Sequence, residues 1–387
     1  MGPLAGVRVL ELAGMGPAPF AAMMLADMGA DVVRIDRYSG SGALPDSERR
    51  IRGTDPTRYV MHRGRQSLGI DLKRPGAAQL MLDLVERSDV FLEGYRPGVA
   101  ERLGIGPGDC LGRNPRLVYG RMTGWGQDGP LAQRAGHDIN YIALSGALAS
   151  IAREGQRPMP PVNFVGDMGG GGLMLGFGVV CGLLNVARTG EGQVIDSAIV
   201  DGSAALTVML YGLLAQGRWS HTPGANFVDT GSPYYEVYET SDRKYVAVGA
   251  IEPTFYAALL QKLGLPDEEV QHQNDRTSWP RLKATFAEIF ASRTRDEWAT
   301  IFEGSDACVS PVLTLEEAAA HPHNQVRQAF VEVDGIVQPA PAPRFSRTPA
   351  ELDRLPPAPG ADTDDVLRRF GKTDDDIAAL RREGIVA

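Results

Sequence analysis

The first 130 residues alternate short apolar runs with segments of helical periodicity, and this pattern constrains the fold more than any other feature. Helical patterns cover residues 18–28 and 75–87. The strand-like runs are residues 7–12, 31–35, 67–72, 90–95 and 117–122. Strands that alternate with helices form parallel sheets whose faces are covered by those helices. The sequence therefore predicts an α/β domain.

A second, smaller block follows a polar segment at residues 218–232 that is rich in glycine and proline. Residues 234–251 have a strand–turn–strand pattern, and helical patterns follow at residues 253–263 and 279–302. Two neighbouring strands followed by a run of helices are typical of an α+β arrangement. We therefore expect a second, smaller α+β domain.

Charge and cysteine content exclude several classes of protein. The 39 Lys and Arg residues against 48 Asp and Glu residues give a net charge of −9, which is unfavourable for general binding to nucleic acid or to an anionic membrane. The three cysteines are far apart and form no Cys-x-x-Cys pair, so we expect neither a disulfide framework nor a zinc site. Residues 1–14 have no secretory pattern, and we expect a cytoplasmic location. The apolar residues 173–186 are too few to span a bilayer and predict a buried helix.

Gly14, Gly16 and the later Asp36 imitate a dinucleotide-binding fingerprint between a strand and a helix. The imitation is imperfect, because Pro19 replaces the third glycine and Pro17 removes an amide donor from the turn. A nicotinamide-dependent dehydrogenase is therefore one alternative. A tight strand–helix turn without a dinucleotide is the interpretation that the prolines favour.

Residues 31–74 are basic within an acidic chain, with ten Lys and Arg residues against six acids. Arginine side chains match the geometry of phosphate oxygens, so this segment could bind a polyphosphate ligand or could be a solvated surface loop. Arg96 follows a predicted strand, where ligands of open α/β sheets bind.

Three further residues are candidates for acid–base chemistry. His137 follows Gly136 at a predicted helix start, where a helix N-terminus favours the neutral, basic imidazole. Asp167 precedes glycines 169–172 and an apolar helix, and amides there could form an anion or oxyanion site. Glu252 stands at the end of a strand before Pro253. The purely structural alternatives are a hydrogen-bonded histidine, a helix N-cap with glycines for packing, and an acid that complements a helix dipole.

These segments together resemble the α-methylacyl-CoA racemases of the class III CoA-transferase (CaiB/BaiF) superfamily. The resemblance covers essentially the whole chain. The motifs that carry it are RIDR (34–37), IDLK (70–73), GYRPGVAERLG (94–104), RMTGWGQDGP (121–130), AGHDINYIALSG (135–146), VGDMGGGG (165–172), VAVGAIEPTFY (246–256), SDACVSPVL (305–313) and APRFSRTP (342–349).

The resemblance implies catalytic roles for His137, Asp167 and Glu252, of which Glu252 orients or pairs with the histidine. It also implies a set of coenzyme A contacts, some of them through the backbone. These contacts are Arg37, Ile70, Asp71, Leu72, Lys73, Gly94, Tyr95, Arg96, Arg102, Gly136, Asp138, Ile139, Asn140 and Tyr141.

The fold that the resemblance implies is an interlocked homodimer. Each subunit has a large Rossmann-like domain with a parallel sheet, a smaller α+β domain and two long linkers. The active site lies between the large domain of one subunit and the small domain of the other, so Glu252 comes from the partner chain. The boundaries that we expect are a large domain over residues 1–190 completed by 331–387, a helical linker over 191–221, a small domain over 222–318 and a return linker over 319–330.

The activity that the resemblance implies is interconversion of (2R)- and (2S)-2-methylacyl-CoA thioesters by 1,1-proton transfer through an enolate. His137 and Asp167 flank the α-carbon, and no metal or separate cofactor is needed, since coenzyme A is part of the substrate. The alternative on the same fold is a class III CoA-transferase with Asp167 as a covalent nucleophile. A protein that binds coenzyme A without catalysis is a third possibility. The acyl chain stays open, although methionines such as Met15 and Met168 could provide an adaptable surface.

Overall fold

A computed structural model describes residues 2–38, 53, 55–352 and 354–387 of the chain. The chain divides into two compact units. The first unit contains Met1–Ser145, Val162–Leu206 and Gln328–Ala387, and the second contains Gly146–Pro161 and Thr207–Arg327.

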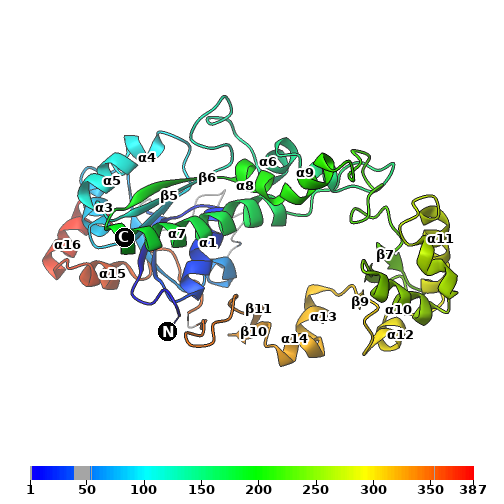
Figure 1. The fold of residues 1–387 in the computed structure, drawn as a ribbon. Helices are drawn as coiled ribbons and strands as arrows, with labels where there is room; N and C mark the ends of the chain where they lie inside the picture. Colours follow the sequence, from blue (N-terminus) through cyan, green and yellow to red (C-terminus); the bar gives the residue numbers. More distant parts are fainter. Residues whose placement is uncertain (1, 39–52, 54, 353) are drawn as a thin grey trace. The chain divides into compact units, whose positions relative to one another are not determined.

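The first unit is built on a six-stranded parallel sheet with the strand order β3-β2-β1-β4-β5-β6. This is the order of a doubly wound Rossmann-type sheet, and it confirms the predicted α/β class. The direction of winding reverses between β1 and β4, which are neighbours in the sheet. The strands are β1 (Arg8–Leu12), β2 (Asp31–Arg37), β3 (Arg65–Ile70), β4 (Val90–Glu93), β5 (Val118–Thr123) and β6 (Gln193–Ala198). Figure 1 labels two of these strands, β5 and β6.

Both faces of the sheet are covered, because alternate residues of each strand point to opposite sides. On β1, Val9 packs with α1 (Pro17–Asp27) and α7 (Met174–Thr189). Its neighbour Leu10 packs in the opposite cluster. The helices on that second face are α3 (Ala77–Val85), α4 (Val99–Arg102), α5 (Pro107–Arg113), α15 (Thr363–Arg369) and α16 (Asp374–Arg382).

The remaining elements of the first unit lie around this sheet. A π-helical segment, η4 (Phe164–Leu173), runs directly into α7. The others are the short turns η1 (Pro56–Arg58) and η2 (Val60–His62), α6 (Asp138–Leu144), α8 (Ile199–Leu206) and the hairpin of β10 (Phe330–Val333) and β11 (Ile336–Pro339).

Residues Phe164–Thr189 are long and apolar enough to cross a membrane by length and composition, and they are the one such stretch among the described residues. One face of α7 packs on the sheet through Leu175 and Val179, as in a core helix. The opposite face is exposed at Phe177, Val180 and Leu184. The helix predicted over residues 173–186 is therefore buried along one face and exposed along the other.

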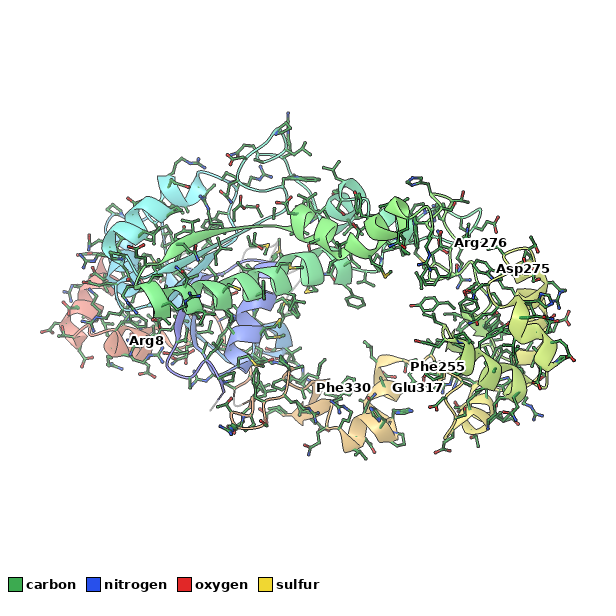
Figure 2. The ribbon with its side chains drawn as sticks, in the orientation of Figure 1. Arg8, Phe255, Asp275, Arg276, Glu317 and Phe330 are labelled. Carbon is green, nitrogen blue, oxygen red and sulfur yellow. The ribbon has the colours of Figure 1, made fainter. Side chains whose placement is uncertain are left out.

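The second unit contains a three-stranded antiparallel sheet of β7 (Tyr235–Glu239), β8 (Tyr245–Gly249) and β9 (Val309–Pro311). Aromatic side chains fill its core, and the Tyr238 and Phe290 rings stack at 5.1 Å. Asp275 and Arg276 precede α11 (Figure 2), and Arg276 lies over the Trp279 ring. The other elements are η3 (Leu148–Ser150), α9 (Val208–Ala215), α10 (Pro253–Leu263), η5 (Asp267–His272), α11 (Trp279–Phe290), α12 (Arg295–Phe302), α13 (Leu315–Ala320) and α14 (Pro322–Val326).

The predicted helical linker of residues 191–221 is wrong in its first part. Gln193–Ala198 form β6, which pairs with β5 over six residues at the edge of the main sheet. Val194 and Ile195 are β-branched and favour a strand. The remainder is helical, but α8 belongs to the first unit and α9 to the second.

Candidate active site

A cavity of about 370 Å³ lies at the carboxyl edge of the parallel sheet, where β1, β4 and β5 end. Ligands of open α/β sheets bind at this edge, at the point where the strand order reverses. His137 and Asp167, the two predicted catalytic residues of the first unit, both line it. The described lining is Gly14, Met15, Gly16, Pro17, Ala18, Tyr59, Met61, Gly94, Met122, Thr123, Gly124, Gly136, His137, Tyr141, Asn163, Asp167, Met168 and Ile199.

His137 is the N-cap residue of α6, and its side chain is exposed at the cavity. Its backbone N–H donates to Oδ1 of Asn140 at 3.0 Å, which secures the start of the helix. The segment before it is fixed by Tyr141, whose ring packs edge-on against Trp125 at 4.7 Å. A Cβ on Gly136 would stand 2.8 Å from that tyrosine ring, so glycine is needed there.

Asp167 reaches the cavity from η4. Its backbone N–H donates to Oδ1 of Asp138 at 2.6 Å, and Nδ2 of Asn163 donates to its Oδ2 at 3.3 Å. Burial raises the pKa of the Asp167 carboxyl, and the charge of Asp138 raises this pKa further. The Asn163 hydrogen bond and His137 oppose the rise. The net effect favours a carboxyl that retains its proton to higher pH than an ordinary aspartate.

The four glycines after Asp167 serve packing and do not provide the expected amide site. A Cβ on Gly170 would stand 2.6 Å from the backbone nitrogen of Ser203 in α8, and a Cβ on Gly172 would stand 2.6 Å from the carbonyl oxygen of Pro17. The N–H of Asp167 is already bonded to Asp138, and the N–H of Met168 donates to the carbonyl oxygen of Asn163. Neither of these two amides is therefore free to bind an oxyanion.

The basic segment of residues 31–74 is partly internal where it is described. Arg34, Arg63 and Arg65 are buried, whereas the other described cations of the segment, Arg37, Arg58, Lys73 and Arg74, are exposed. Arg34 pairs with Asp36 at 2.7 Å, and Arg63 pairs with Asp27 at 2.6 Å. Arg65 pairs with Glu11 of β1 at 2.7 Å, and neither side chain is exposed. These arginines stabilise the sheet and are not available to a phosphate. Arg49, Arg50 and Arg52 lie outside the described residues.

The other predicted coenzyme A contacts of the first unit gather where strands end. Arg37 ends β2 and is exposed, and Ile70 ends β3. Ile70 is completely buried, so its side chain is not open to a ligand. The segment directly after Ile70 contains Asp71, Leu72 and Lys73, and the segment directly after β4 contains Gly94, Tyr95 and Arg96. Helix α4 contains Arg102. The first residues of α6 are Asp138, Ile139, Asn140 and Tyr141. Of this whole set, Gly94, Gly136 and Tyr141 line the cavity together with His137.

Glu252 belongs to the second unit, where it is exposed as the N-cap residue of α10. It lies near Cys308, whose pKa is raised by burial and then by the charge of Glu252. The pairing of Glu252 with His137 stays a prediction.

Sequence reasoning missed several lining residues, among them Tyr59, Met61 and Asn163. Tyr59 and Met61 lie within the basic segment of residues 31–74, whose interpretation rested on its arginines. Asn163 precedes Asp167 by four residues, which is one helical turn. This spacing indicates that the two side chains are neighbours on a helix surface.

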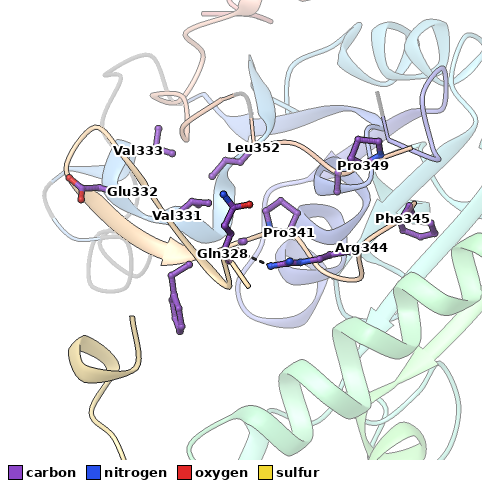
Figure 3. A pocket seen from close by; sticks show the side chains of 12 residues that line it. Gln328, Val331, Glu332, Val333, Pro341, Arg344, Phe345, Pro349 and Leu352 are labelled. Atoms are coloured by element: carbon purple, nitrogen blue, oxygen red, sulfur yellow. Dashed lines mark hydrogen bonds between the residues drawn. The ribbon is translucent and has the colours of Figure 1, made fainter. Parts of the chain in front are cut away.

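A second cavity of about 600 Å³ lies between the β10–β11 hairpin and residues 340–352 (Figure 3). Its walls are mainly apolar, and Nη2 of Arg344 donates to the carbonyl oxygen of Gln328 at 2.9 Å. None of the predicted site residues is among its described lining. Within the part of the chain that the structure describes, no group of three or more His, Cys, Asp or Glu side chains could hold a metal ion.

The fold and the cavity define a class of protein: a doubly wound α/β protein whose ligand site, at the reversal of strand order, contains a histidine and an aspartate. The chain belongs to CoA-transferase family III, whose family model matches residues 4–363.

Two α-methylacyl-CoA racemases and one solved structure are similar to this chain over nearly its whole length. The chain is 45% identical to the mouse α-methylacyl-CoA racemase over 386 residues, which covers 99% of this chain and 97% of that protein. It is 43% identical to the human α-methylacyl-CoA racemase, again over 99% of this chain and 97% of that protein. The crystal structure of a CaiB/BaiF family protein from Brucella suis has the same fold, with a TM-score of 0.80 at 24% identity over 95% of this chain and 99% of that one.

Proposed function

We propose that this protein is a racemase that interconverts (2R)- and (2S)-2-methylacyl-CoA thioesters by 1,1-proton transfer. The observation that carries the proposal is that His137 and Asp167 line one cavity at the switch point of the sheet. Two groups that can exchange protons are needed to invert a carbon centre through a planar intermediate. The similarity to α-methylacyl-CoA racemases over nearly the whole chain supports the same activity.

The proton transfer uses the two side chains in sequence. Neutral His137 removes the α-proton, and the electron pair of the broken C–H bond moves onto the thioester oxygen to form an enolate. Protonated Asp167 then donates its proton to the opposite face of the α-carbon, and the carbonyl re-forms. In the reverse direction the two groups exchange roles. The raised pKa of Asp167 suits a carboxyl that must carry a proton during turnover.

The enolate oxygen needs hydrogen-bond donors, because the α-proton of a thioester is only weakly acidic. The first-turn amides of a helix have no partner inside the helix. Helix α6 begins at Asp138, directly after His137 and beside the cavity. The N–H groups of Asp138 and Ile139 are therefore the best-placed donors, since the N–H of Asn140 already donates to the carbonyl oxygen of His137 at 2.8 Å.

Coenzyme A would be held along the carboxyl edge of the sheet, with Arg37, Lys73 and Arg96 as exposed cations for its phosphates. It is part of the substrate, and no separate cofactor is proposed. Four of the twelve methionines line the cavity, namely Met15, Met61, Met122 and Met168. Their flexible side chains support acceptance of differently shaped acyl chains. A homodimer in which the partner chain supplies Glu252 is part of this proposal.

Deuterium wash-in tests the proposal. The purified protein is incubated with a single enantiomer of a 2-methylacyl-CoA in heavy water, and the α-position is followed by mass spectrometry and chiral analysis. Appearance of deuterium together with the opposite enantiomer supports the racemase. Absence of exchange with several branched acyl-CoAs rejects it.

The second candidate is a CoA-transferase, which the family as a whole favours. Asp167 would then attack the thioester carbonyl to give a mixed anhydride and free coenzyme A thiolate, which would next form an aspartyl-CoA thioester and release the acid. Hydroxylamine trapping distinguishes this candidate, because it would convert an acylated Asp167 into a hydroxamate. A racemase does not acquire this label.

A further inference from the structure

Asp138 connects the two segments that carry the candidate catalytic residues. It directly follows His137 in the chain, and its Oδ1 accepts the backbone N–H of Asp167 at 2.6 Å. His137 and Asp167 are 30 residues apart in sequence and lie in different helical elements. The Asp138 side chain is therefore a direct link between α6 and η4.

The hydrogen bond between Asp138 and Asp167 leaves no space for a side chain at position 166. A Cβ on Gly166 would stand 2.3 Å from Oδ1 of Asp138 and 3.0 Å from Cγ2 of Ile142. Any side chain at position 166 would push the Asp138 carboxylate away from the Asp167 amide. The residue before Asp167 must therefore be glycine for the hydrogen bond to form.

The second carboxylate oxygen of Asp138, Oδ2, indicates that this side chain does more than pack between the two elements. Asp138 is only 7% exposed, and its Oδ2 has no hydrogen-bond partner among the described residues. A buried carboxylate oxygen without a partner is costly. Its negative charge therefore acts on its surroundings with little compensation, and Asp167 is joined to it by the hydrogen bond from the Asp167 backbone.

Among the titratable groups around Asp167, His137 and Tyr141 belong to the start of α6 and to α6 itself, and Tyr59 lines the same cavity from another segment. His137 lowers the pKa of Asp167, and the charge of Asp167 in turn raises the pKa of Tyr141 after burial. Charged residues on two other packed elements are engaged elsewhere: Asp27 of α1 pairs with Arg63, and Arg121 of β5 pairs with Glu93 and Glu101. Asp201 of α8 is exposed.

We propose that Asp138 is a positioning residue that fixes the backbone of Asp167 relative to His137 and places a buried negative charge beside Asp167. The geometric and electrostatic parts of this proposal hold for the free protein, whereas its effect on catalysis rests on the proposed function. The two parts can be separated by experiment.

The electrostatic part is tested without substrate by a carbon-13 NMR titration of aspartate-labelled protein. Asp167→Asn identifies the Asp167 carboxyl resonance. Asp138→Asn keeps an oxygen acceptor for the Asp167 amide and removes the charge, so we expect the pKa of Asp167 to fall by roughly 0.5–1 pH unit. Asp109→Asn is the matched control, since Asp109 also accepts a backbone N–H, from Gly106, in the first turn of an exposed helix. An unchanged Asp167 pKa in Asp138→Asn overturns this part.

The geometric part is tested by Gly166→Ala, which keeps both charges but forces the Asp138 carboxylate away. We expect kcat for racemisation to fall roughly 100-fold with KM nearly unchanged, because a displacement of about 1 Å can cost that much. Gly112→Ala is the control, since a Cβ there meets nothing within 4 Å. Wild-type kcat in Gly166→Ala overturns this part. If the wild-type protein shows no α-proton exchange, the proposed function fails, while the NMR titration and the Asp167 amide shift in Gly166→Ala still decide the role of Asp138.

Discussion

Gly16 lies so close to Asp167 that a Cβ built on it would stand 3.2 Å from the carboxylate Oδ2. Gly16 also has a φ of +71°, which side chains rarely adopt. We expect Gly16→Ala to reduce kcat at least 10-fold by displacing the Asp167 carboxyl, with a modest loss of thermal stability. Initial rates and melting curves check this, and Gly108→Ala, with open space around its Cβ, is the control. Full activity in Gly16→Ala would show that the Asp167 carboxyl tolerates the shift.

Replacement of His137 tests the two-base assignment. His137→Gln should reduce racemisation by about 100-fold or more, because it removes one of the two proton-transfer groups. Asp167 would remain able to exchange the α-proton of one enantiomer without inverting it. Deuterium incorporation from each enantiomer, measured separately, checks this asymmetry. Unimpaired racemisation would contradict the assignment of His137 as a base.

Asp167→Asn should abolish activity and raise thermal stability at neutral and alkaline pH. The folded-state pKa of Asp167 is raised above the ordinary carboxyl value, so the folded state retains a proton that the unfolded chain releases. The stability of the wild-type protein therefore falls as pH rises through the interval between the two pKa values. Melting temperatures should be similar near pH 4 and higher for Asp167→Asn at pH 8. Equal melting temperatures at pH 8 would contradict the raised pKa.

The buried pair of Arg65 and Glu11 should be sensitive to the loss of either partner. Arg65 also donates to the carbonyl oxygens of Pro19 and Met61, and Met61 lines the cavity. Arg65→Met should destabilise the protein by about 3–5 kcal/mol, because it leaves Glu11 buried without a counter-ion. The double variant Glu11→Leu with Arg65→Met should recover part of this loss. Urea denaturation measures both, and equal stability of the two variants would exclude the ion pair as the cause.

Arg37 should contribute to coenzyme A binding without taking part in proton transfer. We expect Arg37→Ala to raise KM for the acyl-CoA roughly 10-fold with little change in kcat, since a charge-assisted phosphate contact at an exposed site is lost. Arg382→Ala removes an exposed charge from α16 and is the control. A KM unchanged by Arg37→Ala would place the phosphates elsewhere.

The sheet was predictable because its strands and helices alternate in the sequence. Neighbouring strand residues face opposite sides of the sheet, as Val9 and Leu10 do, since they pack in different core clusters. The strand at Gln193–Ala198 was assigned to a helical linker, although residues 195–215 begin with a strand-like pattern before the helical one. Local periodicity does not reveal which distant strand a segment will join.

The candidate site was predictable only in part. Chemistry-bearing residues such as His137 and Asp167 could be named, because residue type and a neighbouring glycine are visible in sequence. The role of Asp138 depends on a hydrogen bond between elements 29 residues apart, which no local pattern indicates. Arg34, Arg63 and Arg65 resemble surface cations by composition alone, whereas their partners become visible only when the strands pair.

The end of the chain lies beside β3, where Val386 bridges Ile70 and the N–H of Asp71 donates to the carbonyl oxygen of Ile385 at 2.9 Å. The first unit therefore joins residues at opposite ends of the sequence. During synthesis the apolar side of β3 therefore stays uncovered until α15, α16 and the residues that follow them, almost 300 residues further along the chain, have been made. We expect the nascent large unit to expose this apolar surface until then and to depend on holdase chaperones.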